Sequence, residues 1–239
     1  MKRFQFADSV IYEDEFLLCI NKPPGISTLQ ERNTPFPGLL TLGREIYSGL
    51  RACHRLDKPT SGCLLFAKQF ESFRSMALQF QRRQVEKHYH TFVRGVHQLD
   101  GKYIEAPLSV NKNGLARIDS KEGKLAITVF RTVKTFQHFT LVDCQPITGR
   151  LHQIRAHLAF ANLPIVGDQE YGGEDFFLSE LKRKYKQTKW EDERPVNHGF
   201  QLHARSLTFR HPKTLEPLEI IAEYPKNFGV CLKILEKYD

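Results

Sequence analysis

The sequence predicts an α+β protein in which a mostly antiparallel mixed sheet is flanked by helices. Three observations support this class. Strand-like runs follow one another with the rhythm of hairpins, two stretches have helical periodicity, and 239 residues with 41% hydrophobic composition can form a core. The 15 Gly and 12 Pro are spread along the chain and mark no linker, so we expect a single domain over 1–239.

Two buried strands are predicted near the start of the chain. The first runs from Phe16 to Ile20 and is stopped by the Pro23-Pro24-Gly25 turn, which places Lys22 at a strand end. The second is the apolar run GCLLFAK at 62–68.

A helix is predicted to follow over 69–84. Its apolar stripe consists of Phe70, Phe73, Ala77 and Phe80, and its arginines lie off that stripe.

The middle of the chain alternates as half-buried strands do. In KHYHTFVRGV at 87–96, Tyr89, Thr91 and Val93 lie on one face, and His90 and Phe92 lie on the other. Two more strands are predicted, at 124–133 and 138–144.

A second helix is predicted over 151–161. Its apolar stripe is Leu151, Ile154, Leu158 and Ala161, with Arg155 away from it, and residues 148–150 before it would offer free backbone N–H groups.

Charge and cysteine usage restrict the class of protein. The net charge of +8 favours a polyanionic partner. Five scattered cysteines support neither a disulfide framework nor a zinc site, and the absence of a signal or membrane-spanning stretch predicts a cytoplasmic protein. The charged stretch from Lys182 to Arg194, within an insertion of about 173–200, is interpreted as solvated in preference to an RNA-contacting loop.

The stretch CHRLDKPTSGC at 53–63 places one carboxylate, Asp57, among cations and before a turn. Asp57 could be a salt-bridge partner, a metal ligand or a catalytic carboxylate. No cluster of further oxygen ligands accompanies it, which disfavours a metal. Spacing alone favours the ion pair over catalysis, because perturbed carboxylates are often merely paired.

Five motifs change that balance. The stretch from His54 to Leu65 resembles the HRLDxxTSG signature of the RluA family of RNA pseudouridine synthases. The family's other motifs are matched in order by NKPPG at 21–25, KHY at 87–89, GRLHQIR at 149–155, and PIVGD with YG at 164–172; LHA at 202–204 also fits. The matches extend from about Asp14 to about Pro217.

The resemblance implies the pseudouridine synthase fold with a central cleft, and isomerisation of uridine in structured RNA without a cofactor. Asp57 would be the essential carboxylate, acting as a nucleophile or as the base that removes the sugar 2′ proton. Arg155 would pair with it, Tyr89 would lie against the base, and Leu202 would form an apolar wall.

Three further residues are assigned to RNA binding. Arg55 would enter the stack left by the extruded nucleotide, Arg150 would contact RNA, and Lys22 would either contact phosphate or hold its turn. His54 and His152 are interpreted as structural donors rather than acid–base catalysts, and Cys53 and Cys63 as unactivated thiols.

The wording of the signature and the expected lack of the family's N-terminal RNA-binding module favour tRNA slightly over rRNA as substrate. We expect a monomer without an obligatory protein partner or metal. The alternatives are a non-catalytic RNA-binding protein and an RNA hydrolase that uses Asp57.

Overall fold

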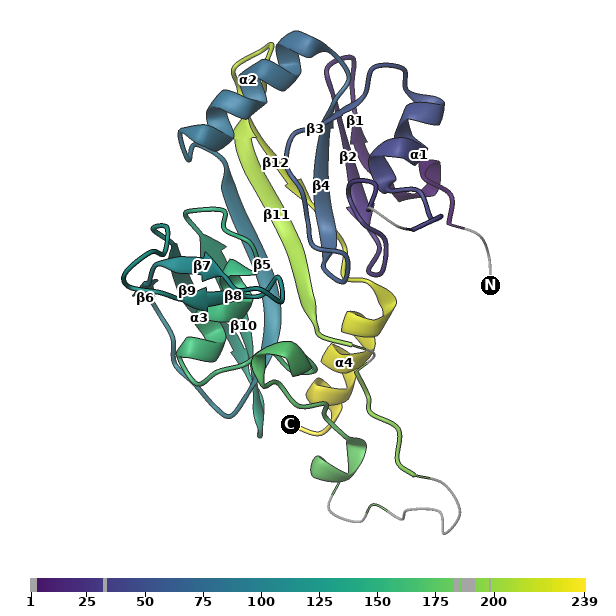
Figure 1. Cartoon of the computed structure of the whole chain (residues 1–239). Helices are drawn as coiled ribbons and strands as arrows, with labels where there is room; N and C mark the ends of the chain where they lie inside the picture. Colours follow the sequence, from purple (N-terminus) through teal and green to yellow (C-terminus); the bar gives the residue numbers. More distant parts are fainter. Residues whose placement is uncertain (1–3, 32–33, 183–184, 186–191, 198) are drawn as a thin grey trace. The chain divides into compact units, whose positions relative to one another are not determined.

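The computed structural model describes residues 4–31, 34–182, 185, 192–197 and 199–239 (Figure 1). The chain divides into two compact units, which are described separately. Unit 1 contains Met1–His88 and His203–Glu223, and unit 2 contains Tyr89–Leu202 and Tyr224–Asp239. That residues 1–239 form a single domain remains a prediction.

Unit 1 is built on a mixed sheet with the strand order β1-β2-β4-β11, in which β3 also pairs with β4 and β12 with β11. These pairs are antiparallel except for β4 and β11, which run parallel. The predicted strands at 16–20 and 62–68 are confirmed as β2 and β4. The strands are β1 (Val10–Glu13), β2 (Leu17–Lys22), β3 (Arg51–Ala52), β4 (Ser61–Ala67), β11 (Leu202–Arg210) and β12 (Pro217–Ile221).

Helices α1 (Leu39–Ile46) and α2 (Phe70–Gln81) pack in unit 1, where the short 3-10 helix η1 (Ala7–Ser9) precedes β1. Alternation along β4 sends Leu65 to the face that packs against α2 and Phe66 to the opposite face. The predicted helix is confirmed, and Phe73 and Phe80 of its predicted stripe pack against the hydrophobic cluster that contains Leu65. Ser72 and Met76 are the fully buried residues of α2, whereas Phe70 is 56% exposed.

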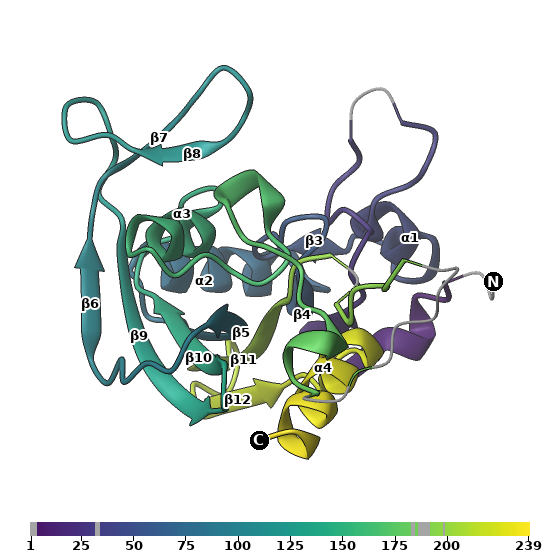
Figure 2. The same cartoon turned by 90° about the horizontal axis from the view of Figure 1, so that it is seen from below.

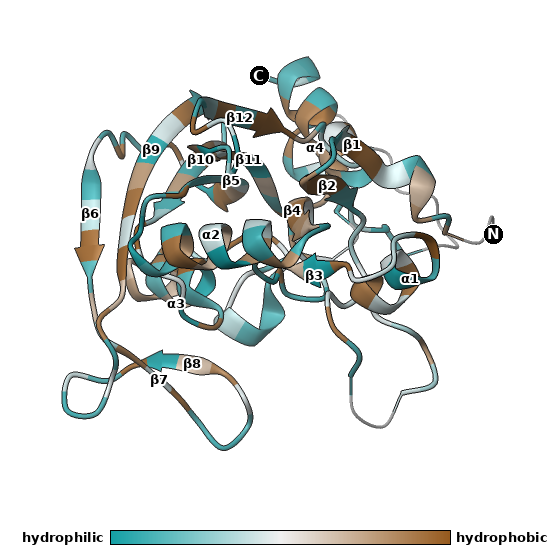
Figure 3. Cartoon of the chain, turned by 90° about the horizontal axis from the view of Figure 1, so that it is seen from above, coloured by the Kyte–Doolittle hydropathy of each residue, from teal (hydrophilic) through white to brown (hydrophobic). Residues whose placement is uncertain are grey.

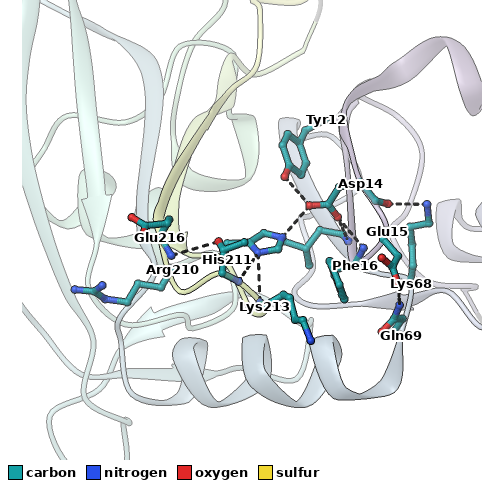
Figure 4. Close-up of polar contacts among 12 residues, drawn as sticks. Tyr12, Asp14, Glu15, Phe16, Lys68, Gln69, Arg210, His211, Lys213 and Glu216 are labelled. Carbon is teal, nitrogen blue, oxygen red and sulfur yellow. Dashed lines mark hydrogen bonds and ion pairs between the residues drawn. The ribbon is translucent and has the colours of Figure 1, made fainter.

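A partly buried polar network joins two turns of unit 1 (Figure 4). Asp14, in the β1–β2 turn, accepts the backbone N–H groups of Phe16 and Leu17, each at 2.7 Å. Its second oxygen accepts Tyr12 Oη at 2.7 Å and His211 Nε2 at 2.8 Å. These bonds tie the β1–β2 turn to the turn between β11 and β12.

Unit 2 contains an antiparallel sheet with the order β5-β10-β9-β6, and a separate β7–β8 hairpin. The predicted strands at 87–96, 124–133 and 138–144 are confirmed as β5, β9 and β10, and β9 carries both hydrophobic and hydrophilic residues (Figure 3). The strands are β5 (Glu86–Arg94), β6 (Lys102–Glu105), β7 (Leu108–Val110), β8 (Ala116–Ile118), β9 (Ile127–Thr135) and β10 (Phe139–Pro146).

Two helices cover opposite faces of this sheet, α3 (Gln153–Phe160) and α4 (Lys226–Lys237) (Figure 2). Val93 of β5 belongs to the cluster that packs on α3, and its neighbour Phe92 belongs to the cluster that packs on α4. Two 3-10 helices follow α3, η2 (Gln169–Tyr171) and η3 (Leu178–Glu180).

The environment of α3 differs from the prediction in two respects. Arg155 was expected away from the buried stripe, yet it is only 3% exposed, because α3 is buried on nearly all sides. The backbone N–H of Arg150 was expected to be free, yet it donates to Oε1 of Gln153 at 3.0 Å.

Three further expectations concern a membrane span, a metal site and the charged stretch from Lys182 to Arg194. No described helix is both long and apolar enough to cross a membrane. Among the described residues, no cluster of three metal-ligating side chains is found. Most of the predicted charged stretch lies outside the described residues, including Arg183, Lys184, Lys186, Lys189 and Trp190.

Candidate active site

The half-buried Asp57 lies in unit 1, in the loop between β3 and β4. Thr28 fixes Leu56, the residue before Asp57. The Thr28 hydroxyl accepts the N–H of Leu56 at 3.1 Å and donates to the carbonyl of Leu56 at 3.0 Å. The N–H of Thr60 donates to the Asp57 carbonyl at 3.0 Å and closes a turn. The backbone on both sides of the carboxylate is therefore held in place.

Lys22 supports the same loop from the end of β2. Its side chain is 0% exposed, and its Nζ donates to the carbonyls of Pro23 at 3.1 Å, Lys58 at 2.9 Å and Thr60 at 2.6 Å. Burial lowers the pKa of Lys22 to about 7, while the negative charge of Asp57 acts to raise it. The loop is thus built around a buried amine that interacts electrostatically with Asp57.

This geometry decides between the two roles predicted for Lys22. A fully buried amine with three carbonyl partners holds the turn, and it presents no surface to an RNA phosphate. The assignment of Lys22 to RNA binding is therefore wrong for this structure, and its role is to shape the loop that carries Asp57.

Replacing Lys22 with methionine is expected to remove a pH-dependent part of the stability. The unfolded chain keeps this proton up to the ordinary value of 10.5, whereas the folded protein releases it near 7. Between these values the unfolded state binds more protons, so this group's contribution to the free energy of unfolding rises with pH; below about pH 7 that gain is lost. Urea unfolding of both proteins from about pH 6.5 to 9.5 measures the difference.

The control is Lys58→Met, which removes an exposed lysine of the same loop. A wild-type minus Lys22→Met difference that stays constant over this pH range would contradict the prediction. It would show that the carbonyls and Asp57 keep the ammonium charged.

The end of the loop is joined to β11 by the second half of the signature. Ser61 Oγ lies 2.9 Å from Nδ1 of the fully buried His203, whose Nε2 donates to the carbonyl of Ala222 at 3.1 Å. Gly62 has a φ of +109°, and a side chain there would collide with the backbone of Ala204. The close approach of β4 and β11 therefore requires glycine at this position and links the TSG and LHA motifs.

The histidine and thiols beside Asp57 are not prepared for catalysis. His54 Nε2 accepts the N–H of Leu65 at 3.1 Å, and burial, with a smaller effect of Lys87, lowers the pKa of His54 to about 3. His54 is therefore a neutral acceptor rather than the predicted donor. Burial raises the pKa of Cys53 to about 12, and Cys63 is fully buried. These observations confirm the prediction of unactivated thiols.

Arg155 lies in unit 2, where its buried guanidinium binds the buried Asp168 and the exposed Glu170. Its Nε donates to Asp168 Oδ2 at 2.7 Å, and its Nη2 donates to Asp168 Oδ1 and Glu170 Oε2, each at 2.6 Å. Burial alone would lower the pKa of Arg155, but the two carboxylates outweigh it and raise the pKa. The guanidinium also lies 4.6 Å from the ring centroids of Tyr171 and Phe200.

Tyr89 and Leu202 are brought together in unit 2. Leu202 is 5% exposed in the hydrophobic cluster that also contains Ile154 of α3, and the half-buried Tyr89 packs against this cluster. Arg55 and Arg150 are both exposed, and Nε of Arg150 donates to the carbonyl of Leu125 at 3.1 Å. The roles of these four residues on RNA remain predictions, as does the pairing of Arg155 with Asp57.

Comparison with known proteins identifies the reaction. The family model described as RNA pseudouridylate synthase matches residues 16–160, which include Asp57, Tyr89 and Arg155. The chain belongs to this family of RNA pseudouridine synthases. Its relatives include the ribosomal large subunit pseudouridine synthases C of Yersinia pestis and Escherichia coli K12. Each is 36% identical, over 97% and 96% of this chain respectively and 70% of the relative.

Solved structures support the fold of the synthase. Human RNA Pseudouridylate Synthase Domain Containing 4 has a TM-score of 0.76 at 25% identity and covers 97% of this chain and 94% of its own. Human RNA Pseudouridylate Synthase Domain Containing 1, at 24% identity, has a TM-score of 0.69 over 94% and 87%. The predicted RluA-type α+β fold and RNA pseudouridine synthase activity are therefore confirmed.

Proposed function

We propose that this synthase converts uridine to pseudouridine in the RNA of the large ribosomal subunit. The observation that carries the proposal is similarity along nearly the whole chain to enzymes whose names specify that RNA. The slight preference for tRNA predicted from the wording of one motif receives no support from these relatives. We therefore treat tRNA as the alternative outcome.

In the proposed reaction the bond between C1′ of the ribose and N1 of uracil breaks, and a bond from C1′ to C5 forms. The C5 proton is lost to water and N1 gains a proton, so the product is an isomer of the substrate. Asp57 acts as the nucleophile or as the base at the 2′ position, and Tyr89 lies against the base. These roles require Asp57 to be ionised.

Arg155 would support the ionised state of Asp57. The bonds of Arg155 to Asp168 and Glu170 use Nε and Nη2. These bonds fix the orientation of the guanidinium plane. Arg55, which is exposed two residues before Asp57, would occupy the space that the extruded nucleotide leaves.

The substrate is tested by mapping pseudouridine in cellular RNA by mass spectrometry. In cells that lack the gene, we expect one or more sites in large-subunit rRNA to revert to uridine and to be restored by the wild-type gene. The Asp57→Ala gene should not restore them. If sites in tRNA alone were lost, the rRNA assignment would be overturned and the synthase activity retained.

A further inference from the structure

Helix α2 ends in a strained conformation at an arginine. Arg83 has a φ of +58°, in the left-handed region that favours glycine. Its N–H donates to the carbonyl of Phe80 at 3.2 Å, and the N–H of Gln84 donates to the carbonyl of Gln79 at 2.9 Å. This is the hydrogen-bond pattern of a helix end at which glycine is the usual residue. A large charged side chain therefore occupies a position where it costs stability.

The end of α2 is also a concentration of positive charge. Arg82 and Arg83 are exposed, and among the described residues neither guanidinium has a carboxylate within ion-pair distance. Lys87 follows four residues later, and burial, together with the charge of Arg83, lowers the pKa of Lys87 to about 8. Arg83 and Lys87 are therefore close enough to interact, and Glu86 is the acid among the three cations in the chain.

This group of cations lies beside the loop that carries Asp57. The ring of Phe80, in the last turn of α2, is 5.1 Å from the ring of His54. Lys87 is close enough to His54 to contribute to the lowering of its pKa. The residue after His54 is the exposed Arg55, which lies two positions before Asp57 in the chain. All of these residues belong to unit 1, so the arrangement is a property of one compact body.

A purely structural role explains part of this arrangement. Cations near the C-terminal end of a helix interact favourably with its dipole, and Arg82 fits that role. The dipole does not explain Arg83, because glycine would relieve the strained backbone at the same position. Strained backbone positions cluster at active sites and ligand-binding segments, and Arg83 lies close to the loop that carries Asp57.

We propose that Arg82, Arg83 and Lys87 form a phosphate-binding site that holds the RNA backbone next to the nucleotide presented to Asp57. The proposal rests on the proposed function in taking RNA as the substrate. It adds the protein surface that holds the RNA strand beside the target uridine. A polyanion would supply the negative charge that the described residues do not place against Arg82 and Arg83.

The decisive variant is Arg83→Gly, which removes the charge while relieving the strain. We expect a higher urea midpoint than wild type, together with RNA binding weakened about three- to tenfold and a salt dependence reduced by about one phosphate contact. The probe is a transcribed large-subunit rRNA hairpin with uridine in its loop, and binding is measured at several salt concentrations in the Asp57→Ala background. Arg83→Asn, which tolerates the same backbone conformation, provides a second variant.

The matched control is Lys233→Gln on α4, which removes one exposed positive charge and should leave binding unchanged. Equal affinity and equal salt dependence for Arg83→Gly and its Asp57→Ala parent would overturn the proposed site. So would a decrease in stability with unchanged binding, which would assign Arg83 to the structure alone. Pseudouridine formation is measured separately with enzymes that retain Asp57. A failure of the proposed rRNA substrate can then be told apart from a failure of the proposed phosphate-binding site.

Discussion

Asp57→Asn is expected to lower the rate of pseudouridine formation at least about 10³-fold under single-turnover conditions. An amide of the same size neither attacks carbon nor removes a proton as a carboxylate does. The backbone around it should persist, because the hydrogen bonds from Thr28 and Lys22 go to the backbone carbonyls of Leu56, Lys58 and Thr60 and none goes to the carboxylate. We expect a change in the free energy of unfolding of about 1 kcal/mol or less.

The rate is measured by digesting the RNA to nucleosides and quantifying pseudouridine over time. RNA affinity should be nearly unchanged, which separates loss of chemistry from loss of binding. Asp8→Asn is the matched control, since it removes an exposed carboxylate elsewhere in unit 1. An Asp57→Asn enzyme within about tenfold of the wild-type rate would remove Asp57 from the reaction.

Arg155→Met is expected to lower the free energy of unfolding by about 3–5 kcal/mol. The side chain of Asp168 is 1% exposed, and the substitution would leave its charge buried without the guanidinium that now makes two bonds to it. Glu170 is a useful contrast because its side chain is 59% exposed. Glu170→Gln should therefore cost less than about 1 kcal/mol. Urea unfolding measures both effects.

The double variant Arg155→Met with Asp168→Asn separates stability from function. Removing the buried charge should restore most of the lost stability, and activity should remain absent because the proposed partner of Asp57 is gone. An active double variant would show that Arg155 acts only by neutralising Asp168. An Arg155→Met protein as stable as wild type would contradict the network itself.

The central strands of the fold could be predicted because their signal, an apolar run or an alternating pattern, is contained in a few consecutive residues. β2 and β4 are short apolar runs, and β5 alternates in the way that the two clusters of unit 2 require. The stripe of α2 was predicted only in part: Phe73 and Phe80 pack against the core, but the most buried residues of the helix were not predicted. Ser72 and Met76 are buried, while the exposed Phe70 lies 5.4 Å from the guanidinium of Arg51. α4 was missed, although Phe228, Cys231 and Leu235 have helical spacing.

The residues of the site were predicted from family motifs more than from charge, spacing or periodicity. Asp57 and Arg155 followed from the family signature, whereas their supports depend on contacts between distant parts of the chain. Thr28 and Leu56 are 28 positions apart, and Lys22 and Thr60 are 38 apart, so local spacing contains no sign of either contact. Asp168 was within a recognised motif 13 positions after Arg155, but nothing in the sequence connected the two. The strain at Arg83 is visible only in the backbone.

Release of tritium from C5 of uridine tests the central claim most directly, because forming the bond to C5 must expel that hydrogen. Wild-type protein is incubated separately with large-subunit rRNA and tRNA transcripts labelled at this position, beside Asp57→Ala. We predict release to water from rRNA by the wild-type protein alone, with pseudouridine in the digested product. Release by Asp57→Ala at the wild-type rate, or free uracil in place of pseudouridine, would contradict an Asp57-dependent isomerisation.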